Sequence, residues 1–192
     1  MGAHCRIFFL GLMLLLTGCI PSLHPLYTPE DLIFDDALLG EWVDKDGKET
    51  WTFAKGDEKQ YKATYVDDDG KKGEFVVHLL KVKDRLFLDL FPVDPELKQN
   101  SFYAVHLMPV HTFLRIELKG QTLRFSLLDS SWIKNFVEEN PGVIRHEKID
   151  NAVLLTAQPK ELQAFLALYE DNAKAWDERP AMTRKPNGAP AP

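Results

Sequence analysis

The sequence predicts a mainly β protein, in which an antiparallel meander closes into a small barrel with one short inserted helix and a C-terminal helix packed outside. Between residues 38 and 156, short runs of alternating apolar and polar residues are separated by turn signals, at the spacing of an all-β meander. The 192 residues are 45% hydrophobic and 27% charged, which indicates one globular domain. Open sheet edges expose unpaired backbone groups, so closure into a barrel is favoured.

Turn signals define the strands. Asp46-Gly47 and Asp69-Gly70 supply the positive backbone torsions that tight hairpins require. We expect strands at residues 41–44, 49–53, 60–66, 73–82, 86–91, 101–107, 112–118, 122–128, 143–146 and 152–155.

The alternation of side chains predicts which face of each strand is buried. Leu114, Ile116 and Leu118 alternate with polar or charged neighbours, so the strand 112–118 has one buried face. Around residues 75–80 and 86–91 both faces are largely apolar. We therefore expect other elements to cover the outer side of these two strands.

Two helices are expected. Residues 131–139 carry apolar side chains along one side and stop at Asn140-Pro141-Gly142. Residues 159–177 form the stronger prediction, because apolar side chains recur along one face after a proline near the first turn. The single barrel domain thus spans residues 37–178, and the Pro- and Gly-containing residues 179–192 predict a disordered tail.

The first eighteen residues follow the plan of a signal peptide. Arg6 precedes an apolar run over residues 7–16. Ten helical residues rise about 15 Å, roughly half the hydrocarbon thickness of a bilayer, so the run is too short to span a membrane. Residues 1–18 are therefore expected to direct export and to be removed.

Leu16-Thr17-Gly18-Cys19 resembles the lipobox of bacterial lipoproteins. The resemblance implies that the Cys19 thiol receives a diacylglyceryl group, that a signal peptidase cuts before Cys19, and that the lipid attaches the protein to a membrane. Two or more acyl chains give a stable anchor. Cys5, the other cysteine, lies in the segment that would be removed, so Cys19 has no disulfide partner in the mature chain.

The residues after Cys19 bear on location. In enterobacterial lipoproteins, Asp directly after the lipidated cysteine retains the protein at the inner membrane, whereas this position holds Ile20. The resemblance therefore favours the outer membrane, facing the periplasm, within the cell envelope. Pro21, Pro25 and Pro29 predict that residues 19–36 form an extended, lipidated stem.

Gly40-Glu41-Trp42 resembles the Gly-x-Trp start of lipocalins, whose barrels end with a helix packed outside. The family's Thr-Asp-Tyr turn motif does not occur in the sequence. In lipocalins an arginine near the last strand stacks on the tryptophan, and the resemblance assigns this role to Arg145. Trp42 and Arg145 are thus the expected barrel-closing pair.

Histidines provide the only candidates for catalysis or metal binding. His78 shares a strand face with Val76 and Leu80, and His106 shares one with Phe102, so both are expected to point inward. The histidine spacings place no two on one face of one element, so no metal and no cofactor is expected. No serine or cysteine lies in a nucleophile motif, which leaves His78 and His106 as candidate bases of a hydrolase.

The sequence therefore predicts a lipid-anchored envelope protein with a non-enzymatic domain that binds a small apolar ligand or another envelope protein. Two alternatives stay open, a hydrolase that uses His78 or His106 and a structural role in envelope assembly. Sequence does not distinguish a hollow barrel from a filled one, although we favour a filled interior. The net charge of −6 excludes nucleic acid as a partner.

Overall fold

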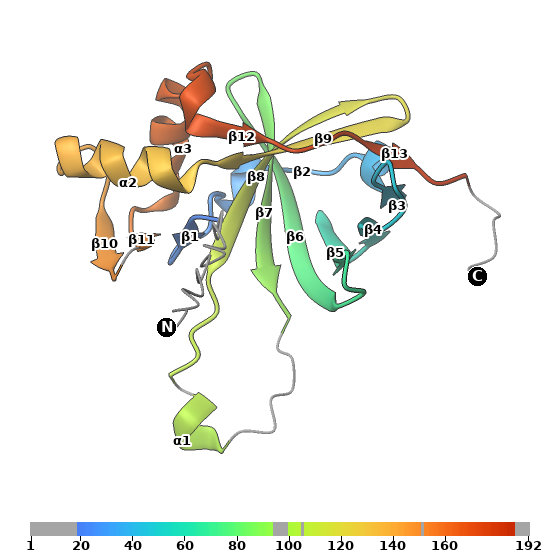
Figure 1. Ribbon diagram of the computed structural model, residues 1–192, viewed down its shortest axis with the longest axis horizontal. Coiled ribbons are helices and arrows are strands. Elements are labelled where there is room, and N and C mark those ends of the chain that lie inside the picture. The colour runs from blue at the N-terminus through green and yellow to red at the C-terminus, as the bar shows by residue number, and fades with distance from the viewer. Residues whose placement is uncertain (1–18, 94–99, 105, 151, 187–192) are drawn as a thin grey trace, which may run out of the picture.

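A closed barrel of eight antiparallel strands forms the body of the protein (Figure 1), as the sequence predicts. The computed structural model describes residues 19–93, 100–104, 106–150 and 152–186. The barrel strands are, in order of pairing, β3 (Gly40–Val43), β4 (Thr50–Lys55), β5 (Gln60–Val66), β6 (Lys72–Val82), β7 (Arg85–Pro92), β8 (His111–Lys119), β9 (Thr122–Leu128) and β13 (Met182–Arg184). Strand β13 pairs with β9 on one side and with β3 on the other, which closes the sheet.

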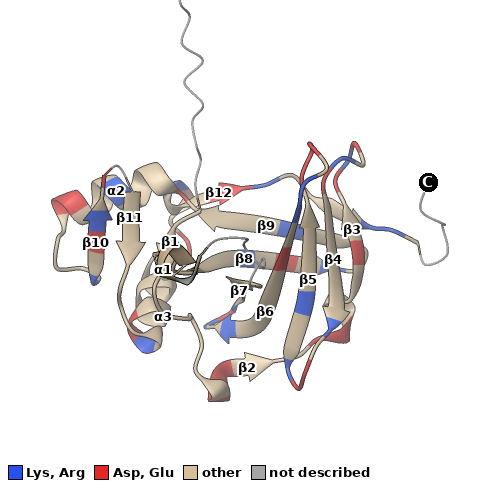
Figure 2. Ribbon diagram, turned by 90° about the horizontal axis from the view of Figure 1, so that it is seen from below, with Lys and Arg blue, Asp and Glu red and all other residues tan. Residues whose placement is uncertain are grey.

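The hairpin turns between the early strands form where the sequence predicts them. Gly47 in the β3–β4 turn and Gly70 in the β5–β6 turn have φ values of 70° and 76°. An L side chain rarely adopts such values, which explains the Asp-Gly pairs. Figure 2 shows acidic and basic residues gathered at these turns.

The barrel interior is filled with side chains. Leu114 and Ile116 point into it, as the alternation predicts, together with Trp42, Phe53 and other apolar residues of the inner core. The rings of Trp51 on β4 and Phe125 on β9 lie 5.7 Å apart, so aromatic side chains meet across the interior. The close packing indicates a solid barrel rather than a container.

A second core lies outside the barrel. Leu80 and Val82 of β6 and Phe87 of β7 pack outward against α2 (Ser130–Glu139), α3 (Pro159–Leu168) and the N-terminal segment. The expected cover over the outer faces of these strands is therefore present (Figure 1). Asp129 caps α2 by accepting a hydrogen bond from the Trp132 N–H.

The N-terminal segment is part of the fold, so the prediction of an extended stem over residues 19–36 is wrong. Strand β1 (Pro21–Ser22) pairs with β8 and with β11 (Ala152–Leu155), which in turn pairs with β10 (His146–Ile149). The segment continues through η1 (Pro29–Asp31), β2 (Leu32–Ile33), which pairs with β6, and η2 (Asp36–Leu38). Its prolines keep the backbone extended locally, but Leu26 is fully buried and fixes the segment on the barrel.

Two predictions at the C-terminus are also wrong. The helix expected over residues 159–177 ends at Leu168, because Asn172 accepts a hydrogen bond from the Lys174 N–H and the chain turns into η3 (Ala173–Ala175) and β12 (Trp176–Glu178). The tail expected to be disordered from residue 179 contains β13, since Met182 enters the inner core. Residues 187–192 lie outside the described residues.

The strand expected at residues 101–107 is instead a short helix, α1 (Ser101–Ala104), in the loop between β7 and β8. The side chain of Asn100 accepts a hydrogen bond from the Tyr103 N–H at 2.9 Å, which favours a helical turn over an extended strand. Figure 1 shows α1 projecting well away from the barrel. None of the helices in the described ranges is long and apolar enough to cross a bilayer.

Candidate functional site

The barrel is closed by a contact between Trp42 on β3 and Arg184 on β13. The guanidinium of Arg184 lies 4.2 Å from the centroid of the Trp42 ring, and the indole Nε1 donates a hydrogen bond to the Leu38 carbonyl. Arg184 also donates hydrogen bonds to the carbonyl oxygens of Leu39 and Ala37. An arginine from the last strand thus stacks on the tryptophan of the first strand.

Arg145 does not take this role, and the pairing predicted for it is wrong. Its side chain is exposed and forms an ion pair of 2.6 Å with Glu161 at the start of α3. Arg184 escaped prediction because it lies in a segment whose composition suggests disorder. The glycine at position 40 was the available signal, because its φ of 117° is one that other residues rarely adopt and a Cβ there would lie 2.9 Å from Nη1 of Arg184.

A buried carboxylate joins the N-terminal segment to the barrel. Asp89 on β7 is fully buried on the outer face, where its Oδ2 accepts a hydrogen bond of 2.6 Å from the Leu26 N–H. Its Oδ1 lies 2.6 Å from Nδ1 of His111, which donates to it. Two donors satisfy a carboxylate that would otherwise be costly to bury. Asp89 therefore clamps the segment that follows Cys19 against β7 and β8.

The two histidines expected to point inward do not do so. His78 on β6 faces outward beside Asp89, and the ring of Tyr27 covers it at a centroid distance of 4.3 Å. His106 is exposed, and its Nδ1 lies 2.8 Å from the Phe102 carbonyl. The sequence did contain a signal for the cluster, since Asp89 is the one charged residue within the apolar run over residues 86–92 of β7.

The Asp89–His111 hydrogen bond is the arrangement by which an acid orients a general base. Ser22 is the residue beside His111 in the β1–β8 register. However, its Oγ is committed to the His24 carbonyl at 2.7 Å and the residue is fully buried. The cluster thus has the character of a structural clamp rather than of an activated nucleophile.

We expect the stability of the protein to fall as the pH drops below about 6.5, because burial lowers the pKa of His78 from that ordinary value. The nearby Asp89 raises the pKa of His78 and His111 lowers it, but burial has the largest effect. The unfolded chain then takes up a proton at a higher pH than the folded chain. The contribution of neutral His78 to the free energy of unfolding is therefore fully present above the ordinary pKa, and it is lost as the pH falls through and below that value.

Urea unfolding at neutral pH and at mildly acidic pH measures this loss. His78→Phe, which retains a ring against Tyr27, should reduce the loss, whereas His106→Phe at an exposed position should not. Equal losses in the wild type and the His78 variant would show that His78 does not contribute to it.

Cys19, the expected lipidation site, lies at the edge of the fold. The residue is exposed, whereas Ile20 next to it is buried in the outer core and β1 begins at Pro21. An apolar crevice beside Cys19 is lined by Phe113, Leu166 and other side chains of that core. The other lipobox residues, Leu16, Thr17 and Gly18, lie outside the described residues.

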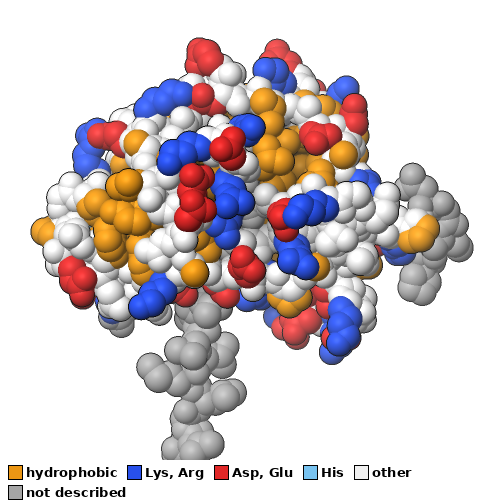
Figure 3. Space-filling model, turned by 90° about the horizontal axis from the view of Figure 1, so that it is seen from above, with side chains coloured by type: hydrophobic (Ala, Val, Ile, Leu, Met, Phe, Trp, Pro, Cys, Tyr) orange, Lys and Arg blue, Asp and Glu red, His pale blue; other side chains and the backbone are white. Residues whose placement is uncertain are grey.

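A hollow of about 350 Å³ opens where β7 and β8 separate, and both inner-core and outward-facing side chains line it. The pairing of β7 with β8 ends at Leu86 and Ile116, whereas β8 and β9 stay paired as far as Lys119. Arg115 and Arg124 are among the side chains that line the hollow. Figure 3 shows hydrophobic side chains exposed among acidic and basic ones on the upper face of the molecule.

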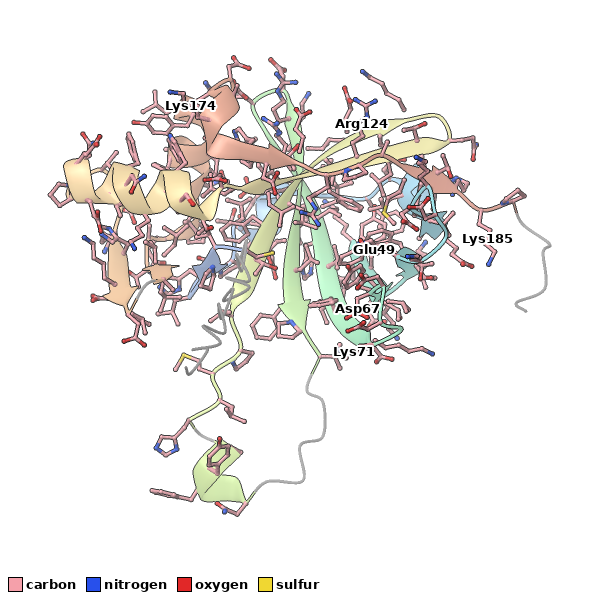
Figure 4. All side chains as sticks on the ribbon, in the orientation of Figure 1. Glu49, Asp67, Lys71, Arg124, Lys174 and Lys185 are labelled. Atoms are coloured by element: carbon pink, nitrogen blue, oxygen red, sulfur yellow. The ribbon has the colours of Figure 1, made fainter. Side chains whose placement is uncertain are left out.

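The described residues contain no group of three His, Cys, Asp or Glu side chains placed to hold a metal ion. In the acidic turn after β5, the Asp67 carboxylate stabilises the turn itself, since its Oδ1 accepts hydrogen bonds from the backbone N–H groups of Asp69 and Lys71. Figure 4 shows Asp67 and Lys71 at this turn.

Comparison with known proteins gives no match, whether to a protein-family model, to a curated protein or to a solved structure.

Proposed function

We propose that this is a lipid-anchored protein of the bacterial envelope, attached through Cys19 to the outer membrane on its periplasmic side, and that it acts by binding another envelope protein. The observation that carries the proposal is an exposed apolar arm, the described residues 100–104 and 106–110 between β7 and β8. Phe102 is 78% exposed, Met108 67% and Tyr103 52%. Large apolar side chains gathered at one projecting site are typical of interaction surfaces.

The filled interior supports an interaction role over carriage of a ligand inside the barrel. Trp42, Phe53 and Tyr61 are buried almost completely within it. A ligand between these strands would have to displace side chains packed at the density of a protein core. The small apolar ligand considered from sequence is therefore the weaker of the two binding hypotheses.

The chemistry of the arm favours a protein over a lipid surface. Residues 93–110 contain two acidic residues, Asp94 and Glu96, and one lysine, Lys98. Their net charge is therefore negative, and anionic lipid head groups would repel it. Phe, Tyr and Met are enriched at protein interfaces, where charged residues are depleted. We expect the partner to present an apolar groove that receives Phe102 and Met108.

The position of Cys19 fits an anchor held close to the domain. Because Ile20 is buried and β1 follows at once, lipid on the exposed Cys19 would leave almost no free chain between membrane and barrel. The clamp from Asp89 to the Leu26 N–H holds the same segment further along. This geometry would hold the exposed apolar arm at a nearly fixed distance from the membrane surface.

Photo-crosslinking in intact cells tests the proposal, with the photoreactive residue at position 103. We expect discrete crosslinked products with another protein, and about a fivefold or greater loss of them in Phe102→Ser/Met108→Ser, because hot-spot truncation costs about 1 to 2 kcal/mol or more. Both side chains are exposed, so the variant should keep its thermal stability within about 0.5 kcal/mol.

Ile149→Ser provides the matched control, since Ile149 is 54% exposed on β10, outside the arm. It should leave the crosslinks unchanged. Crosslinks to lipid alone, or a product yield that the arm variant does not alter, would argue against a protein partner at this surface.

A further inference from the structure

The floor of the hollow between β7 and β8 is apolar. Ile116 and Phe125 are 6% and 5% exposed, and Leu86 and Leu118 contribute partly buried side chains. A volume of about 350 Å³ lies within the range of small-molecule sites. The floor can therefore receive an apolar body of modest size.

Arg115 is a preoriented cation at the side of this floor. Its guanidinium lies 4.4 Å from the Trp176 ring centroid, and its Nη1 donates to the Glu170 carbonyl at 2.8 Å. The side chain is only 15% exposed. Burial lowers the pKa of Arg115 and the like charge of Arg85 lowers it further, whereas the charges of Glu178, Asp171 and Glu117 raise it. Arg85 is itself paired with Asp171 at 3.0 Å, so acidic side chains already offset part of the positive charge beside the hollow.

The acidic side chains around the hollow already have cationic partners. Glu117 pairs with Lys119 at 2.6 Å, and Glu178 lies 3.7 Å from Arg115. Asp84 lies 3.9 Å from Lys81.

Arg124, which faces Glu117 in the β8–β9 register, makes no ion pair with any described residue. The side chain is exposed and extends from the upper side of β9 (Figure 4). A hydrogen bond from Lys119 and the charge of Arg124 both lower the pKa of Glu117, but Glu117 makes its ion pair with Lys119, so the Arg124 guanidinium can receive a ligand at the rim of the hollow.

We propose that the hollow binds a small amphiphile with an anionic head group, a carboxylate or a phosphate. Arg124 holds the head group, the positive charge of Arg115 lies beside the same hollow, and the apolar body lies on Leu86 and Leu118. Arginine suits both head groups because its planar fork donates two parallel hydrogen bonds to either. This site is separate from the apolar arm and does not depend on lipid at Cys19.

Calorimetric titration of the purified protein with decanoate, decyl phosphate and decanol, each below its aggregation concentration, tests the proposal. Both anions should bind saturably, and decanol about tenfold more weakly, because a hydrogen bond to a charged group contributes about 1.5 kcal/mol. Tighter binding of decyl phosphate would identify a phosphate head group, and equal or tighter binding of decanoate would identify a carboxylate.

Arg124→Gln should weaken the binding of both anions about tenfold. Arg145→Gln removes the same charge from an exposed arginine elsewhere and should leave the affinity unchanged. Phe102→Ser/Met108→Ser should also leave it unchanged, which separates this site from the arm. Absence of saturable binding by either anion, or equal affinity of the wild type and Arg124→Gln, would overturn the proposal.

Discussion

Replacing Met182 and Arg184 together by alanine is expected to lower the free energy of unfolding by about 4 kcal/mol, because a buried Met side chain contributes about 2 to 5 kcal/mol and a cation–π contact about 1 to 2. Met182 is 4% exposed in the inner core, and Arg184 stacks on a fully buried Trp42. The variant would leave β13 held between β3 and β9 by backbone pairing and by the ion pair of Lys185 with Glu41 at 2.9 Å. Urea unfolding measures the loss.

Thr183 between them provides the control, because its side chain is exposed while its backbone shares the same pairing. Thr183→Ser should change the unfolding free energy by less than about 0.5 kcal/mol. Amide hydrogen exchange should accelerate in β3 of the double variant before it does in β6. If the double variant were as stable as Thr183→Ser, β13 would not close the barrel.

Asp89→Ala is expected to cost about 3 to 5 kcal/mol, the range seen when one partner of a buried charged pair is removed. The Leu26 N–H and His111 Nδ1 would both lose their acceptor within the outer core. Asp89→Asn keeps one carbonyl oxygen and should cost less. Denaturant unfolding gives the free energies, and hydrogen exchange at Leu26 reports the release of the N-terminal segment.

Asp84→Ala supplies the comparison, because the Asp84 side chain is 97% exposed and should contribute less than about 0.5 kcal/mol. Equal stabilities of the Asp84 and Asp89 variants, with unchanged exchange at Leu26, would show that the carboxylate does not clamp the segment.

The sequence predicts the barrel well where local patterns determine the structure, namely the alternation of apolar and polar residues in strands and the Asp-Gly pairs in turns. Leu114 and Ile116 face the interior as their spacing requires, and Gly47 and Gly70 occupy the positive torsions that Asp-Gly indicates. The apolar outer faces of β6 and β7 likewise predict a covering layer, which the outer core supplies.

Prediction fails where tertiary contacts outweigh composition. Prolines suggest a free stem after Cys19, but burial of Leu26 and its hydrogen bond to Asp89 hold that segment in the fold. The composition of the tail suggests disorder, but Met182 and Arg184 find sites in the barrel that only the closed fold creates. Such sites leave no local pattern in the sequence.

The candidate site residues illustrate the same limit. His78 and Asp89 lie opposite each other in the β6–β7 register, a proximity that depends on how the two strands are aligned. His111 joins them from β8, again through pairing. The hollow around Arg124 arises from the point at which β7 and β8 separate, which no spacing of residues reveals.

Mass spectrometry of the N-terminal peptide, from protein purified out of membranes of a bacterial host, tests the anchored-domain account most directly. The account predicts a peptide that begins at Cys19 and carries the added mass of a diacylglyceryl group. A peptide that retains residues 1–18, or one that begins at Cys19 with a free thiol, would contradict it.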